Sequence, residues 1–218
     1  MEIEALIIKI IIAAIPILLA ITVHEASHGY AAKHFGDLTA EKLGRISLNP
    51  FKHIDPVGTV LLPALTLFFG GVLFGWAKPV PVNFGNLRNP KKDMLWVAAA
   101  GPASNFVMAI GWSMLLGMIK YALAHGTYSP AFPFLLQMSY VGVTINVVLM
   151  VLNLLPMPPL DGGRIAVSLL PNQWAFKLAQ VEKYGFLILI ALMFTGVLGK
   201  IIGPFIDFFE RAILQVFA

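Results

Sequence analysis

Two histidines and a glutamate stand at metal-ligand spacing in the stretch HEASH, residues 24–28. A helix places residues four apart on one face, so the imidazoles of His24 and His28 are expected to share a metal ion. Glu25 is placed to take a proton from a water molecule that this metal activates. The motif is short enough to arise by chance, and without a metal it would be a polar pair at a membrane interface. A zinc site therefore needs the support of a further ligand.

Asp161 is the candidate for that ligand. It follows an apolar run in NLLPMPPLDGGR, where three prolines take the backbone out of helix. Irregular backbone at membrane depth needs protein or a polar cavity around it, and a buried carboxylate needs a cation. The alternative is an interfacial turn built on Asp-Gly-Gly. Two histidines and one carboxylate would leave the fourth position of zinc open for water.

His34 is not expected to bind the same metal. The longer metzincin pattern needs a glycine that turns the chain back before a third histidine, and Ala31 stands at that place. If the helix continues, His34 lies about 240° around the axis from His28. We interpret it as a solvated helix end.

The composition is that of a membrane protein with several spans. Of 218 residues, 58% are hydrophobic and 12% charged, and the mean hydropathy is +0.82. This leaves room for about five membrane-length helices and little for a soluble domain. The net charge of +4 lies in short loops, which favours a positive-inside bias over nucleic-acid binding. The chain has no cysteine, which excludes disulfides, thiolate ligands and a cysteine nucleophile.

We predict an all-α polytopic membrane protein with about four to five transmembrane helices, forming a single domain over residues 1–218. Between the second and third runs, the Pro-rich residues 78–84 are expected to be extended, as a strand or as a plain loop. Residues 203–218 have the pattern of an interfacial helix. The apolar runs are 5–23, continuing as helix to about 35, and 57–76, 94–121, 132–155 and 186–202.

The second run, residues 57–76, is predicted to be re-entrant. His28 and Asp161 can share a metal only at similar depth, so their spans must run in the same direction, which a full crossing by 57–76 would prevent. Re-entry also places eleven of the fifteen Lys and Arg residues on one side. By the positive-inside rule, the zinc site is then near the cytoplasmic face of the cell membrane and the N-terminus is outside. The four cations on the other side are Lys9, Lys120, Lys200 and Arg211.

The sequence resembles the site-2 protease family of intramembrane zinc metalloproteases. The matching stretches are HEASH, GRISLNPFKHIDPVGT, GWAKPVPVN, AAGPASNF and NLLPMPPLDGGR, in this order. The resemblance implies one zinc ion held by His24, His28 and Asp161, with Glu25 as general base. It also implies a role for Asn153 close to the scissile peptide, polarising its carbonyl. The chain resembles a minimal form of the family, without a PDZ-like or nucleotide-binding domain.

We therefore predict a zinc metalloendopeptidase that cleaves transmembrane segments of membrane-anchored proteins. A substrate must be extended before cleavage, and it could pair with the edge of residues 78–84 on which Val80 and Val82 keep their N–H donors. The alternative is a membrane metal-ion transporter, since intramembrane His and Asp also mark ion pathways. Such a transporter would not need Glu25. Other roles stay open: Asn105 lines the cavity or, as we favour, packs helices, Asn146 is a structural hydrogen bonder, and His53 and Asp55 support the site or form an interfacial turn.

Overall fold

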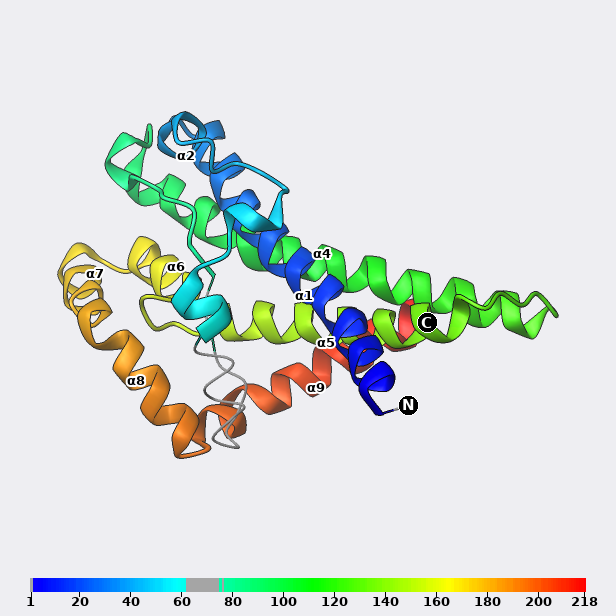
Figure 1. Ribbon diagram of the computed structural model, residues 1–218. Helices are drawn as coiled ribbons and strands as arrows, with labels where there is room; N and C mark the ends of the chain where they lie inside the picture. Colours follow the sequence, from blue (N-terminus) through cyan, green and yellow to red (C-terminus); the bar gives the residue numbers. More distant parts are fainter. Residues whose placement is uncertain (1, 62–74, 76) are drawn as a thin grey trace.

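The computed structural model describes residues 2–61, 75 and 77–218, and all regular structure in this part of the chain is helical (Figure 1). The all-α prediction is confirmed. Three long helices form the body: α1 (Glu2–His34), α4 (Pro90–Ala124) and α5 (Phe132–Asn153). Between α1 and α4 lie α2 (Thr39–Lys42), the π-helical turn η2 (Pro56–Leu61) and the 3-10 turns η1 (Pro50–Lys52) and η3 (Phe84–Asn86). After α5 follow α6 (Asp161–Leu169), α7 (Asn172–Ala179), α8 (Glu182–Phe194) and α9 (Val197–Phe217).

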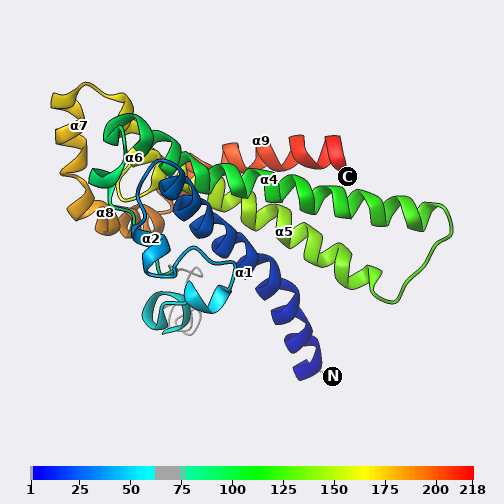
Figure 2. The same cartoon turned by 90° about the horizontal axis from the view of Figure 1, so that it is seen from above.

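The long helices α1, α4 and α5 pack in one bundle, in which α1 and α5 run in the same direction and α4 runs the opposite way (Figure 1, Figure 2). Small buried residues, among them Ala20, Ala109 and Gly142, lie between them. Lipid is as apolar as a leucine side chain, so close packing and hydrogen bonds hold such helices together. The common direction of α1 and α5 is the arrangement that a metal shared by His28 and Asp161 requires.

Among the described residues, three helices are long and apolar enough to cross a membrane, namely α4, α5 and residues 8–34 of α1. Helices α8 and α9 qualify together as a fourth span, but they meet at 82°. Gly196 lies at this bend with φ 71°, a conformation that glycine adopts without steric cost. The predicted run 186–202 is therefore broken into two helices. The described residues hold three or four of the four to five predicted spans.

The connection from α1 to α4 starts and finishes at the same end of the bundle. The Arg88 N–H donates to Phe35 O at 3.0 Å, and the Lys78 N–H donates to His53 O at 2.9 Å. The chain that leaves His53 has therefore returned to the same place by Lys78. The prediction of re-entry concerns the path between these two residues, at 57–76. Of this path, residues 62–74 and 76 lie outside the described residues.

Residues 77–83 form neither helix nor strand, and the described part of the chain offers them no partner strand. Asn83 has an extended backbone, and Phe84, the last residue of the predicted extended segment, begins η3. The predicted β-strand is thus absent from the described residues, and an extended backbone for the rest of the segment stays a prediction. We call residues 77–83 the crossing segment.

Helix α9, which contains the predicted interfacial residues 203–218, runs alongside α4 and in the same direction (Figure 1, Figure 2). The rings of Phe106 and Phe209 are 6.4 Å apart, and Ser113 Oγ donates to Ile213 O at 3.2 Å. Farther along, Lys120 Nζ lies 3.5 Å from Ala218 O. One apolar face of α9 therefore packs on the bundle. Its buried members are Leu198, Ile202 and Ile213.

Candidate metal centre

His24, His28 and Asp161 converge at one point of the bundle. Their ligand atoms all lie within 4.8 Å of one another. The two Nε2 atoms of the histidines are 3.0 Å apart, and Asp161 Oδ2 lies 3.2 Å from that of His24 and 3.3 Å from that of His28. Within the described residues, no other three acidic or histidine side chains form such a group. The structure thus brings together the three residues that the sequence predicts as ligands.

Helix α1 and the turn after α5 set this geometry. His24 and His28 lie one turn apart on α1, while Asp161 is the first residue of α6, directly after the Pro-rich turn that ends α5. Gly163 packs against this turn so closely that an added Cβ would lie 2.6 Å from Pro158 Cα, nearer than real Cβ atoms approach. The glycines after Asp161 therefore serve close packing, which keeps the carboxylate beside the histidines.

The hydrogen bonds behind the histidines assign their protons. His24 Nδ1 lies 2.6 Å from Asn105 Oδ1, and His28 Nδ1 lies 2.7 Å from the Val97 carbonyl oxygen. Both partners are acceptors, so each Nδ1 carries the hydrogen and each Nε2 presents a lone pair. Asp161 Oδ2 is buried and has no hydrogen-bond donor among the described residues. Three electron-pair donors face one another with no proton between them, an arrangement that fits a divalent cation.

Helix α4 approaches the same point through Gly101, in the stretch AAGPASNF. An added Cβ on Gly101 would lie 2.6 Å from His24 Nε2 and closer still to the His28 ring. Only a glycine leaves room here for both imidazoles. The sequence analysis did not assign this role to Gly101, although a glycine between small residues of a membrane helix indicates close helix contact.

Glu25 lies beside the three candidate ligands and outside their group. Its Oε2 accepts the N–H of Val80 at 2.7 Å, so the crossing segment passes the site. The sequence analysis expected this N–H to be free for a substrate, and in the structure Glu25 binds it instead. Arg45 also holds the crossing segment, because its Nη2 donates to Lys78 O at 2.9 Å.

Asn153 is the last residue of α5 and is half-buried. Its Nδ2 donates to Leu149 O at 2.9 Å, one turn back on the same helix. A side-chain amide has two N–H donors, so this bond leaves one of them for another acceptor. The role of Asn153 at a scissile peptide stays a prediction.

The remaining polar residues singled out from the sequence lie between the helices, at the end of α1 and in the loop after η1. Asn105 is fully buried and does pack between helices, but it also contacts a predicted ligand, a contact that packing alone did not predict. His34 is exposed at the end of α1, as predicted. His53 and Asp55 build the loop after η1: His53 Nε2 bonds Ser47 O at 2.9 Å, and Asp55 Oδ1 accepts two backbone N–H groups.

Asp37 ties the far end of the crossing segment to α1. Its side chain is fully buried, Oδ2 accepts the Asn83 N–H at 2.7 Å, and Oδ1 accepts the Thr39 N–H at 3.0 Å and Asn86 Nδ2 at 3.1 Å. Burial raises the pKa of this carboxyl, but the hydrogen bonds from Thr39, Asn83 and Asn86 outweigh burial and hold the pKa of Asp37 below its usual range.

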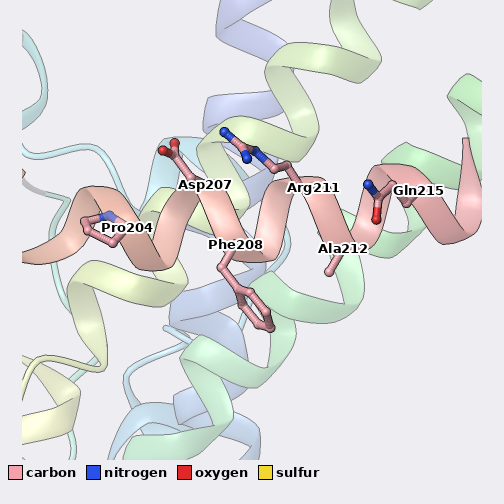
Figure 3. Close-up of a pocket in the computed structure, with 6 residues that line it drawn as sticks. All are labelled: Pro204, Asp207, Phe208, Arg211, Ala212 and Gln215. Atoms are coloured by element: carbon pink, nitrogen blue, oxygen red, sulfur yellow. The ribbon is translucent and has the colours of Figure 1, made fainter.

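A surface hollow on α9 is separate from the metal centre (Figure 3). It has a volume of about 390 Å³, and the described residues that line it all belong to α9. None of the predicted site residues belongs to it, so its size does not mark it as the reactive centre. Its lining residues are Pro204, Asp207, Phe208, Arg211, Ala212 and Gln215.

The chain is similar to a family of peptidases and to proteins named as zinc metalloproteases. The family described as Peptidase family M50 matches residues 115–196. The Bacillus subtilis protein named "Putative zinc metalloprotease YwhC" is 38% identical over 206 residues, which cover 94% of this chain and 90% of that protein. The Mycolicibacterium smegmatis protein named "Putative zinc metalloprotease Rip2" is 34% identical over 84% of this chain and 66% of its own length. The Mycobacterium tuberculosis (H37Rv) protein of the same name is 26% identical over 83% of this chain. No solved structure matches the chain.

Proposed function

The chain belongs to peptidase family M50, the site-2 proteases, and from this premise we propose that it is an intramembrane zinc metalloendopeptidase. Its apolar helices and the names of its relatives support the broader description, a membrane zinc metalloprotease. One observation carries the proposal: two imidazole lone pairs and a carboxylate with a buried Oδ2 face one another beside Glu25, which is outside their group. We take residues 1–218 as one catalytic domain.

His24, His28 and Asp161 would hold one zinc ion per chain. Neutral imidazoles and a carboxylate are a donor set that zinc accepts, and three protein ligands leave one position for water or substrate. When bound, zinc lowers the pKa of water and polarises the peptide carbonyl. Asn105 and the Val97 carbonyl keep the histidine protons on Nδ1, so both Nε2 atoms stay free for the metal.

Glu25 acts as the general base. It takes a proton from the attacking water as the C–O bond forms and delivers it to the amine nitrogen as the peptide bond breaks. The Val80 N–H holds Oε2 at 2.7 Å, which orients the carboxylate and leaves Oε1 for the proton. Asn153 polarises the carbonyl of the scissile peptide through its remaining N–H.

The substrate is a membrane-spanning segment of another protein, made extended before cleavage. The crossing segment supports this class of substrate because it is not helical and has no strand partner among the described residues. In that part of the chain the Val82 N–H also finds no acceptor. A substrate strand would accept from Val82 and so lie next to Glu25.

Two substitutions test the function. Glu25→Gln is expected to keep zinc, because Glu25 is not a ligand, and to lower the cleavage rate of a helix-destabilised single-pass substrate by about 10²–10⁴. Asp161→Ala is expected to lose both zinc and cleavage. The measurements are metal content and cleavage by the purified chain in detergent. Undiminished proteolysis by Glu25→Gln would remove Glu25 from the mechanism, and a transporter would show metal uptake into vesicles that Glu25→Gln leaves intact.

We propose that the metal centre faces the cytoplasm and that the N-terminus lies outside, on the charge distribution described above. The chain has no cysteine, so each introduced cysteine is its only thiol. Leu38→Cys and Asn89→Cys, one on either side of the α1–α4 connection, are expected to react with a membrane-impermeant reagent from the cytoplasmic side. Thr127→Cys, between α4 and α5, is expected to react from outside. If Leu38→Cys and Asn89→Cys react from opposite sides, the connection crosses the membrane and the proposed topology is wrong.

A further inference from the structure

Two buried amides stand behind His24. Asn105 on α4 and Asn146 on α5 are each 0% exposed. Asn105 Oδ1 lies 2.6 Å from His24 Nδ1, and Asn105 Nδ2 donates to Asn146 Oδ1 at 2.9 Å. This chain of contacts joins α1, α4 and α5 at the level of the metal centre.

Two backbone carbonyls determine which way each amide points. Asn105 Nδ2 also donates to Ala20 O at 3.3 Å, and Asn146 Nδ2 donates to Gly142 O at 2.8 Å. A carbonyl oxygen can only accept a hydrogen bond, so neither amide can be turned over without placing two acceptors together. The oxygen of Asn105 must therefore face His24, and His24 must donate from Nδ1.

The two histidines differ in how their protons are held. His28 donates to a backbone carbonyl, that of Val97, at 2.7 Å. His24 instead depends on one side chain, that of Asn105. The tautomer of His24, unlike that of His28, can thus be changed by substituting one side chain.

Resting on the proposed zinc site, we infer that Asn105, held in place by Asn146, is a positioning residue that fixes the Nδ1–H tautomer of His24 and thereby sets zinc affinity. A packing role needs only a side chain of similar size and does not require an acceptor facing His24. Partners of this kind behind a metal-binding histidine commonly change metal affinity about 10–100-fold.

Two variants of Asn105 separate positioning from packing. Asn105→Leu is similar in size and has no acceptor, so zinc affinity should fall about 10–100-fold. Asn105→Asp keeps the acceptor for His24 Nδ1. Its second carboxylate oxygen, however, lies against Asn146 Oδ1, so two acceptors are in contact. It should therefore bind zinc more tightly than Asn105→Leu even though it is the less stable protein. If Asn105 only packs, the order of zinc affinity is reversed. Asn105→Asp, with its buried carboxylate, should then bind zinc more weakly than Asn105→Leu and also be less stable.

The measurements use the full chain in detergent micelles. Zinc affinity is obtained by competition with a chelator, and the tautomer of His24 in the metal-free protein by nitrogen NMR of ¹⁵N-histidine. Wild type and Asn105→Asp should show His24 protonated at Nδ1, and Asn105→Leu should show a mixture. Ser113→Ala is the matched control, because Ser113 is also fully buried on α4 but bonds Ile213 O on α9. Its zinc affinity should equal that of wild type.

The inference is overturned if Asn105→Leu binds zinc as tightly as wild type, or if Asn105→Asp binds it more weakly than Asn105→Leu. His24→Ala distinguishes this failure from failure of the metal site itself. If His24→Ala loses zinc while Asn105→Leu keeps it, the site stands and only the positioning role falls. If His24→Ala also keeps zinc, the proposed ligand set is wrong.

Discussion

Helix α4 passes through two environments that differ in how much space a side chain has. At Gly101, beside the metal centre, an added Cβ would lie 2.6 Å from His24 Nε2. At Gly111, farther along the same helix, an added Cβ would meet no described atom within 4 Å. The same residue type is thus required at one position and replaceable at the other, because only the first faces two imidazoles.

The two environments also differ in their buried polar groups. At the metal end, hydrogen bonds between helices connect His24, Asn105 and Asn146 in one chain. In the far half of α4, the described contact to α9 rests on apolar side chains, the buried bond from Ser113 to Ile213 O and the exposed bond from Lys120 to Ala218 O. Buried polar networks specify one arrangement when every member is satisfied. The structural demand on the sequence is therefore concentrated where the ligands meet.

The strongest test of this contrast substitutes the two glycines in turn. Gly101→Ala is expected to lose stoichiometric zinc and cleavage, because overpacking costs about 1–3 kcal/mol and here strains both imidazoles. Gly111→Ala should keep both activities and gain up to about 1 kcal/mol of helix stability. Metal content and thermal unfolding in detergent measure the two effects. Equal zinc binding by both variants would mean that α4 does not confine the histidines.

Asp37 offers a test of the metal end outside the membrane. Asp37→Asn places an amide among N–H donors, so the protein should lose about 1–3 kcal/mol of stability at neutral pH. The folded pKa is lowered, so the stability that Asp37 contributes is complete above its ordinary pKa of about 4 and is lost as the pH falls through the folded value. The difference in unfolding free energy between wild type and variant should therefore be constant above about pH 4 and shrink as the pH falls below that value. A difference that stays constant in the acid range below about pH 4 would show that the charge of Asp37 is not what binds Asn83.

The smallest expected effect concerns the crossing segment. Val82→Pro removes one main-chain donor, worth about 0.5–1.5 kcal/mol, so cleavage should slow about 2–10-fold with zinc retained. Val82→Ala is the control, because it shortens the side chain and keeps the N–H. Equal slowing in both variants would assign the effect to the side chain and leave the N–H without a role in substrate binding.

Much of the metal end was predictable from residue types and spacing. The four-residue interval places His24 and His28 on one helix face, and the prolines before Asp161 place a carboxylate where helix must end. The partner of His24 was not predictable in the same way. An asparagine among small residues can bond any neighbouring helix, and only the packing of α4 on α1 decides that Asn105 meets an imidazole.

The neighbour of α9 was not predictable for a different reason. Asp207, Glu210 and Arg211 give this helix the polar face of an interfacial helix, and its apolar stripe fits either a headgroup layer or a neighbouring helix. The pattern does not distinguish these two surroundings. The bond from Ser113 to Ile213 and the close rings of Phe106 and Phe209 show that α4 is the neighbour.

The distribution of the ligands over α1 and α6 has a consequence for synthesis. A ribosome completes Asp161 133 residues after His28. At about 5–20 residues per second, this interval lasts on the order of ten seconds, during which α1 already carries both histidines and no third ligand exists. A nascent chain in the translocon would therefore be a weak two-histidine chelator and not a protease. The reactive centre would be completed only after α4 and α5 had emerged, which protects the insertion machinery from a premature membrane protease.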